Sequence, residues 1–410
     1  MQDMSGAMPV KASERYAILD ILRGFALLGI ILANFPEFSL YTFLSSEAAA
    51  SMPSAGADRA VRWLQGIFVD GKFYTIFSLL FGVGFSIILS NAQKRGADGY
   101  RIFYRRMLVL LMIGFLHLMF IWSGDILMLY ALMGMLLPLF SRLSDRAILR
   151  CAGVLLLVPV AVDTLTDALG VSLSAPVVRT QQDYCARYGI NDENFAYWLR
   201  DAKSYKEVLE FLVQGAFVRM QEFIDGNRYF KVLGLFLIGF WAGRRRLYAD
   251  LATYRPQLRK IALIGLCVGL PFSALYTWSG LAGHPYGLGL HAALYCLGVY
   301  PLGFAYVALL SLLHLRLPGL RVFRVLAAPG RMALTNYIFQ SVFGMFIFYG
   351  IGFGQGASMG LSLVALVAFG IYLIQAAFSA FWIARFNFGP LEWIWRMLTY
   401  GKTFPLVRRG

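Results

Sequence analysis

Ten apolar stretches, each long enough to cross a lipid bilayer, dominate this sequence. An α-helix rises 1.5 Å per residue, so about 20 apolar residues span a hydrocarbon core about 30 Å thick. Of the 410 residues, 59% are hydrophobic and only 14% are charged, whereas soluble domains carry about 25% charged residues. The sequence therefore predicts an all-α polytopic membrane protein with about ten transmembrane helices, over residues 17–35, 69–90, 107–122, 125–140, 148–165, 229–243, 261–279, 287–313, 333–350 and 359–384.

Basic residues are concentrated in every second connection between these stretches. The connections near 123–124, 280–286 and 351–358 contain no Lys or Arg. Because cytoplasmic loops of membrane proteins are enriched in Lys and Arg, the pattern predicts that both termini are cytoplasmic. The net charge of +15 is thereby explained by topology, which argues against a nucleic-acid partner. The basic segments are 11–15, 94–106, 142–150, 244–260, 316–331 and 385–409.

A polar interruption divides the chain. The predicted parts are an N-terminal membrane half of five helices (1–165), an external insertion (166–228), and a C-terminal membrane half of five helices with an interfacial C-terminal helix (229–410). In the insertion, apolar residues from Tyr205 to Phe223 recur at spacings of three and four, which predicts an amphipathic helix. Two interpretations stay open for it, a structural lid and a functional gate. The connection over 36–68 is rich in Ser and Ala and is expected to be irregular.

Polar residues at the cytoplasmic ends of the stretches are the first candidates for a site. Asp20 and Arg23 share one helix face. Each is costly alone in a membrane, by about 2.5–3.5 kcal/mol, so the pair predicts a polar interior on that side. Arg331 lies at the same level. Asn336 and Gln340 are four residues apart and face neighbouring helices, either for interhelical hydrogen bonds or for a ligand.

A second polar layer lies toward the external side. Asp70 and Lys72 are two residues apart and do not face each other on a helix, so each pairs elsewhere or marks an interface. His117 precedes Asp125 across the short Ser123-Gly124 turn, which makes the two spatial neighbours. A carboxylate that orients an imidazole is the arrangement of a general base, and a packing role is the alternative. The four cysteines and the histidines form no metal-ligand spacing, so no metal site is predicted.

Five sequence motifs carry a resemblance to a known family: Leu19-Asp20-x-x-Arg23-Gly24, Asp70-Gly-Lys-Phe-Tyr-Thr-Ile-Phe-Ser-Leu-Leu-Phe-Gly82, Gly330-Arg-Met-Ala-Leu-Thr-Asn-Tyr337, Gln340-Ser341 and Gly389-Pro-Leu-Glu-Trp-Ile-Trp-Arg396. They resemble the YeiB-like bacterial inner-membrane family, a domain-of-unknown-function group. That family is grouped with transmembrane acyltransferases, including the lysosomal heparan glucosaminide acetyltransferase and O-antigen acetylases. The resemblance implies a multi-pass protein of the bacterial inner membrane with an acyl-CoA or similar donor on the cytoplasmic side and an acceptor on the other.

One position departs from the acetylases. Many of them carry a catalytic His ten residues after the Gly of the Arg-Gly pair, and that position here is Asn34. A neutral Asn hydrogen-bonds a substrate but does not accept a proton at pH 7. At the other end of the chain, Glu392 and Arg396 are four residues apart and flank two tryptophans, which predicts an interfacial helix. This helix anchors the chain or, with Arg331, binds an anionic head group.

Three functions follow as hypotheses. In a membrane acyltransferase, Arg23 and Arg331 hold the donor phosphates, Asn34 positions the acceptor, and His117 with Asp125 supplies the base. In a transporter or lipid-handling protein, the same polar layers form a path or a cavity for a lipid ligand. In a scaffold or sensor, the 166–228 segment is the external contact.

Overall fold

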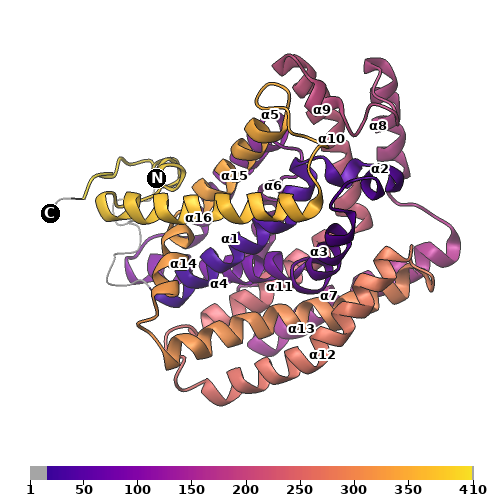
Figure 1. The fold of residues 1–410 in the computed structure, drawn as a ribbon. Helices are drawn as coiled ribbons and strands as arrows, with labels where there is room; N and C mark the ends of the chain where they lie inside the picture. The colour runs from indigo at the N-terminus through magenta and orange to yellow at the C-terminus, as the bar shows by residue number, and fades with distance from the viewer. Residues whose placement is uncertain (1–15, 409–410) are drawn as a thin grey trace.

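The computed structural model describes residues 16–408 of the chain, and it consists of helices joined by short connections (Figure 1). Lys11, Arg15 and Arg409, which the charge pattern included, lie outside the described residues. Every predicted apolar stretch coincides with a helix. These are α1 (Ala17–Phe38), α4 (Lys72–Lys94), α5 (Gly99–Phe120), α6 (Leu127–Phe140), α7 (Asp145–Leu169), α11 (Arg228–Arg244), α12 (Arg255–Leu281), α13 (Gly287–Arg316), α15 (Ala333–Phe348) and α16 (Leu361–Arg385).

Seven segments among the described residues are long and apolar enough to cross a membrane: α1, the α3–α4 segment Ala55–Lys94, α5, α7, α12, α13 and α16. Helices α6 and α15 are apolar and shorter. Large apolar side chains such as Leu157 on α7 and Leu366 on α16 are exposed. An apolar outer surface over long helices is what a hydrocarbon environment requires. The chain is therefore a multi-pass membrane protein.

The remaining helices lie in the connections between these stretches or after the last of them. They are η2 (Tyr41–Phe43), α2 (Ser46–Ala50), α3 (Ala55–Phe68), α8 (Ala175–Tyr188), α9 (Trp198–Asp201), α10 (Tyr205–Asp225), α14 (Arg321–Arg331) and α17 (Pro390–Tyr400). Figure 1 shows α8, α9 and α10 gathered at one end of the molecule. Helix α10 matches the predicted amphipathic helix. Helix α3 lies in the connection that was expected to be irregular, and tertiary contacts hold it: Gln65 donates to the Leu32 carbonyl, and Asp58 accepts from the backbone and hydroxyl of Ser362.

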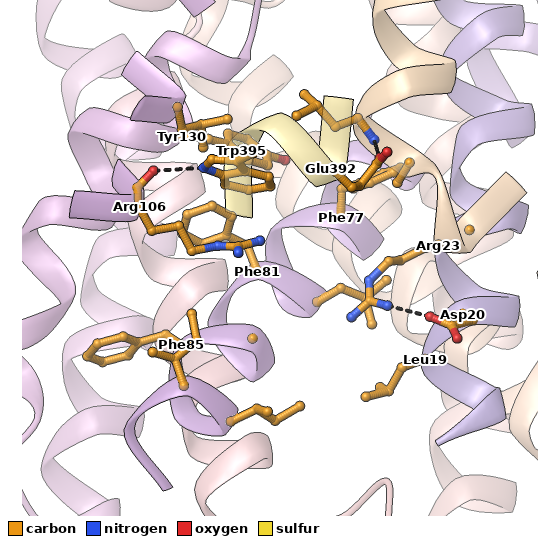
Figure 2. Close-up of a pocket in the computed structure, with 18 of the residues that line it drawn as sticks. Leu19, Asp20, Arg23, Phe77, Phe81, Phe85, Arg106, Tyr130, Glu392 and Trp395 are labelled. Atoms are coloured by element: carbon orange, nitrogen blue, oxygen red, sulfur yellow. Dashed lines mark hydrogen bonds and ion pairs between the residues drawn. The ribbon is translucent and has the colours of Figure 1, made fainter. Parts of the chain in front are cut away.

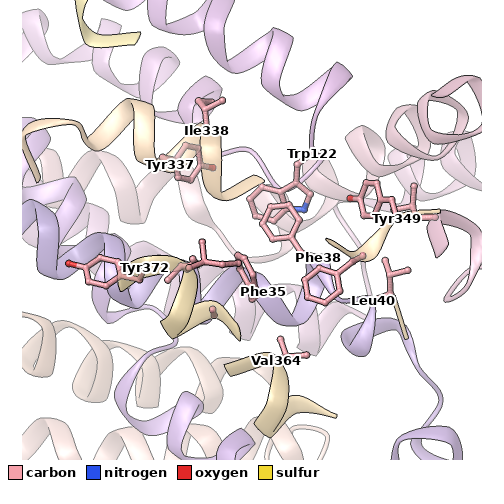
Figure 3. Close-up of a cluster of buried hydrophobic side chains, with 14 of the residues drawn as sticks. Phe35, Phe38, Leu40, Trp122, Tyr337, Ile338, Tyr349, Val364 and Tyr372 are labelled. Carbon is pink, nitrogen blue, oxygen red and sulfur yellow. The ribbon is translucent and has the colours of Figure 1, made fainter. Parts of the chain in front are cut away.

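Helix α1 lies at the centre and packs against α4 from its own half of the chain and against α14, α15 and α16 from the other half. Helices α4 and α11 form a second cross-half contact, and α12 packs on α13. Beyond the middle of α1, Phe35 and Phe38 enter a cluster of buried apolar side chains with Trp122 and Tyr349 (Figure 3). The Phe38 and Trp122 ring centroids lie 4.3 Å apart. The two sequence halves are thus joined around α1.

Two glycines allow α1 and α14 to cross at backbone contact. A Cβ atom built on Gly24 overlaps the carbonyl oxygen of Leu326, and one on Gly330 overlaps the carbonyl oxygen of Asp20. No side chain larger than hydrogen fits at either position without moving a backbone. The residues next to these glycines, Arg23 and Arg331, are consequently brought to the same end of the bundle.

Candidate functional site

A cavity of about 560 Å³ runs into the bundle between α1, α4, α5, α6, α14, α15 and α17 (Figure 2). Its lining residues on α4 extend from Tyr74 to Lys94. Twenty residues of helix correspond to about 30 Å, so the cavity follows the bilayer-spanning direction for most of the length of α4. Lys94 and Arg246 at one end of the lining are exposed. That end is therefore the open one.

The open end is strongly basic. Six basic side chains line the cavity there, against two acidic ones, Asp20 and Glu392. Arg23 forms an ion pair with Asp20 at 2.6 Å, and the guanidinium of Arg106 lies 3.6 Å from the ring centre of Trp395. Figure 2 shows Arg23 and Arg106 pointing into the space from opposite sides. We call this group the basic mouth; its members are Arg23, Lys94, Arg106, Arg246, Arg331 and Arg396.

The inner part of the cavity is apolar and aromatic. Phe77, Phe81 and Phe85 recur at spacings of four on α4, so they line one face of that helix. Tyr130 on α6 adjoins this face: its ring centre lies 5.6 Å from that of Phe81, and its hydroxyl is held by Ser78 at 2.7 Å. Guanidinium groups bind phosphate oxygens bidentately, and an aromatic channel excludes water from a hydrocarbon chain. The cavity therefore suits an elongated molecule with an anionic head and an apolar tail.

Helix α17 forms part of the cavity wall. It begins at Pro390 after Gly389 and ends before Gly401, whose φ of 65° is the left-handed conformation typical of a helix end. The Glu392 carboxylate accepts hydrogen bonds from the backbone of Leu334 and Thr335 (2.7 and 3.1 Å) and from the Thr335 hydroxyl (2.6 Å). A carboxylate there complements the positive end of α15. Burial raises the pKa of Glu392.

A buried triad of side chains lies deeper in the bundle. The Nδ1 atom of His117 on α5 lies 2.8 Å from Oδ2 of Asp125, and its Nε2 atom lies 2.8 Å from Oγ of Ser341 on α15. All three side chains are about 1% exposed. The second oxygen of Asp125 accepts from the backbone N–H of Met128 at 2.8 Å, at the start of α6. We call this group the Asp125–His117–Ser341 triad.

Tyr337 separates the triad from the cavity. Its side chain lines the cavity, and its ring centre lies 5.3 Å from that of His117. Ser341 is four residues further along α15, one helical turn from Tyr337 on the same face. Ile126, the residue after Asp125, also lines the cavity. The inner end of the cavity and the triad are therefore separated by one layer of side chains.

On its other side the triad is covered by α10, which belongs to the 166–228 segment. Arg219 of α10 donates to the carbonyl oxygen of Ser123 in the α5–α6 turn (3.0 Å) and pairs with Glu37 of α1 (3.2 Å) and with Glu222. The ring centre of Trp122 lies 6.1 Å from that of His117. Helix α10 thus packs directly over the α5–α6 turn that separates His117 from Asp125.

The structure brings together five of the residues that the sequence singled out: Asp20, Arg23, Arg331, Glu392 and Arg396 all line the cavity. His117 and Asp125 are in contact, as the short turn between them predicts, and they lie behind Tyr337.

The other candidates lie outside the cavity. Asn336 donates to Ser379 (2.9 Å) and Gln340 to Gln375 (3.1 Å), so these two residues link α15 to α16. Asp70 pairs with Arg62 at 3.3 Å, and the buried Lys72 ammonium donates to the Gly66 carbonyl at 2.6 Å. Asn34 is half-buried on α1, one turn beyond the cavity-lining Ile30.

Three residues of the site carried no assigned functional role in the sequence: Arg106, Tyr337 and Ser341. Arg106 belongs to a basic segment that the charge pattern explains by topology. Tyr337 and Ser341 lie in two of the sequence motifs, but in the sequence they look like ordinary polar residues of a helix. Their role depends on which residue of α5 they face. Trp395 was expected to anchor α17, and its indole donates to the Arg106 carbonyl at 3.0 Å.

The chain is similar in sequence to bacterial proteins. Residues 242–402 match the model of a family described as protein of unknown function (DUF418). The chain is 28% identical to the uncharacterized protein YxaH of Bacillus subtilis over 426 aligned residues, covering 99% of both chains. It is 30% identical to an uncharacterized 39.9 kDa protein of Bacillus acidopullulyticus, over 97% of this chain and 98% of that one. It is 28% identical to the uncharacterized protein YeiB of Escherichia coli, over 97% and 99%.

Proposed function

This chain belongs to the family of proteins of unknown function DUF418, and for this member we propose an acyltransferase activity at the basic cavity. In this proposal the cavity takes an acyl donor that carries phosphate groups, such as an acyl-CoA. The acyl group passes at the inner end of the cavity to an acceptor from the other side of the membrane. The observation that carries the proposal is one cavity that joins the basic mouth to the wall of the Asp125–His117–Ser341 triad.

The basic mouth supplies the binding energy for the head of the donor. Arg23 and Arg331 lie at the crossing of α1 and α14, and Arg106 lies across the cavity on α5. Partly desolvated guanidinium groups form charge-assisted bonds with phosphate that are about twice as strong as neutral hydrogen bonds. The acyl chain then follows the aromatic face of α4 toward Tyr337.

The triad supplies the proton transfer. Asp125 orients the His117 imidazole and stabilises its charged form, which is the task of a carboxylate next to a general base. Asn34, one turn beyond Ile30 on α1, is proposed to position the acceptor. It replaces the histidine of the acetylases that the sequence resembles, and His117 takes over as the base.

The proposed topology has ten membrane-crossing helices in the bacterial inner membrane, with both termini in the cytoplasm. The charge pattern of the loops supports this orientation. The exposed Lys94 and Arg246 at the mouth belong to basic segments, so the same orientation opens the cavity to the cytoplasm, where acyl-CoA is made.

The test uses the purified full chain in lipid nanodiscs with labelled acetyl-CoA and longer acyl-CoAs. We expect saturable binding and slow release of free CoA. Arg23→Ala should weaken binding at least tenfold because an interaction with phosphate is lost. Arg259→Ala, which removes an exposed arginine outside the cavity, is the matched control and should bind like the wild type. Wild-type protein that neither binds nor consumes any acyl-CoA would refute the proposal.

A second candidate function is favoured by the apolar lining of the inner cavity. The same space accommodates an anionic membrane lipid that the protein binds or moves without chemistry. One outcome would establish this function in place of acyl transfer. The purified wild type would retain an anionic lipid more tightly than the Arg23→Ala variant does, and it would leave acyl-CoA unchanged.

A further inference from the structure

We propose that Ser341 is the nucleophile of this site and carries the acyl group as a covalent ester between donor and acceptor. This inference deepens the proposed acyltransferase function and rests on it. It assigns a residue that belongs to the same buried triad but for which neither the sequence nor the comparisons indicate a role.

The hydrogen bonds of His117 determine which group it activates. Asp125 as a carboxylate only accepts hydrogen bonds, so Nδ1 of His117 carries the proton that it shares with Asp125 at 2.8 Å. The Nε2 atom then has a lone pair, and the hydroxyl 2.8 Å away is that of Ser341. A base that acted directly on the acceptor would present Nε2 to the cavity. Here Nε2 faces Ser341, in the relationship that a Ser–His–Asp triad uses.

The hydroxyl of Ser341 is bonded differently from that of Ser311 on α13. A serine within a helix commonly donates to the carbonyl four residues earlier, as Ser311 does to Val307 at 2.7 Å. Ser341 bonds instead to a side chain on another helix, 224 positions away in the chain. Its hydroxyl is therefore aimed at the imidazole and not used by its own backbone.

The surroundings suit an ester intermediate. The triad is buried, and the ring centres of Trp122 and Tyr337 lie 6.1 and 5.3 Å from that of His117, so water that would hydrolyse an ester is excluded. Tyr337 lies on the same face of α15, one turn nearer the cavity. A change in the rotamer of this side chain is the movement that gives the donor carbonyl access to Ser341.

The reaction balances in two steps. The Ser341 oxygen attacks the thioester carbonyl, its proton passes to Nε2 of His117, the carbon–sulfur bond breaks, and the proton goes to the leaving thiolate. A hydroxyl or amine of the acceptor then attacks the ester, His117 takes its proton, and that proton returns to the Ser341 oxygen as the ester bond breaks. No redox partner or metal is needed for either step.

The experiment has two independent readouts. Intact-mass and peptide analysis after incubation with a labelled acyl-CoA should show one acyl adduct on the peptide that contains Ser341. An alkyl fluorophosphonate should phosphonylate the same serine without needing a donor. Ser341→Ala should lose both adducts and lower turnover at least about 10³-fold, as for loss of a serine nucleophile. Ser379→Ala removes a buried serine that bonds only Asn336, and both adducts should persist.

A cysteine variant guards against loss of folding in the alanine variant. Ser341→Cys keeps a nucleophile at the position, and its adduct should be a thioester that neutral hydroxylamine cleaves, whereas the wild-type ester resists. Turnover that survives in Ser341→Ala, with no adduct in the wild type, would overturn the serine assignment and leave acyl transfer standing. Fluorophosphonate labelling of Ser341 without binding or consumption of acyl-CoA would support an activated serine at this position. It would refute acyl-CoA as the donor.

Discussion

The Nε2 atom of His117 lies 2.8 Å from the hydroxyl oxygen of Ser341, although the first residue belongs to the N-terminal half of the chain and the second to the C-terminal half. Helix α15 packs against the central α1, and α5 packs against α4, which also contacts α1. Asp125, anchored to the start of α6 through Met128, completes the arrangement. The geometry of the triad thus depends on helix packing across the whole bundle.

The first prediction concerns Asp125. Asp125→Asn keeps the size of the side chain, but its amide nitrogen donates to Nδ1 and moves the imidazole proton to Nε2, which then no longer accepts from Ser341. We expect the rate of acyl transfer to fall about 10²–10⁴-fold, as in other triads with the wrong tautomer. The measurement is turnover of labelled acyl-CoA. Asp58→Asn, which alters a buried carboxylate at the start of α16, should retain the wild-type rate constant per folded molecule.

The second prediction tests the crossing of α1 and α14. Gly24→Ala places a methyl group on the Leu326 carbonyl oxygen, and the backbones must separate. Overpacking of this kind costs about 1–3 kcal/mol or more, so the melting temperature in detergent should fall and the basic mouth should bind donor more weakly. Gly370→Ala has open space around the new methyl group and should stabilise the helix by up to about 1 kcal/mol. Equal melting temperatures for the two variants would contradict the close crossing.

The third prediction concerns pH and Glu392. Burial raises the pKa of this carboxyl in the folded protein above its value in the unfolded chain, about 4.3. The folded state therefore binds more protons, and the free energy of unfolding should fall as the pH rises from about 4.3 through the raised pKa. Glu392→Gln should remove this part of the pH dependence. Melting curves between pH 4 and 8 measure the effect, and the test fails if both proteins show the same slope.

The fourth prediction concerns the ion pair between Arg219 of α10 and Glu37 of α1. Arg219 is 8% exposed and Glu37 26%, so Arg219→Met leaves a partly buried carboxylate without its partner. Breaking a buried pair costs about 3–5 kcal/mol, and the exposure of Glu37 favours the lower end. The double variant Arg219→Met/Glu37→Gln should recover part of this loss. Arg228→Met removes a more exposed arginine, 3.8 Å from Glu222, and should change the melting temperature little.

The sequence predicts the helices well because hydropathy is a local property. Each apolar stretch carries enough information to specify a helix, and the short turn between α5 and α6 sufficed to bring His117 next to Asp125. Helix α3 was missed because its stability depends on distant partners, Leu32 and Ser362.

The rest of the site depends on helix register, which a single sequence does not contain. Ser341 could be recognised only once α15 was known to face α5 at that turn. Arg106 was explained by topology alone, since a charge pattern does not distinguish an arginine that faces a cavity from one that faces water. The cavity itself is a property of seven helices together, and no single segment encodes it.

The place of α17 in the cavity wall has a consequence for biogenesis. Residues 390–400 leave the ribosome after every membrane helix described here, yet they contribute Glu392, Trp395 and Arg396 to the lining. The basic mouth therefore stays incomplete while the preceding membrane helices are being inserted, and it acquires the charge and shape described here only after α17 has emerged. A nascent chain that still lacks α17 cannot form this cavity wall.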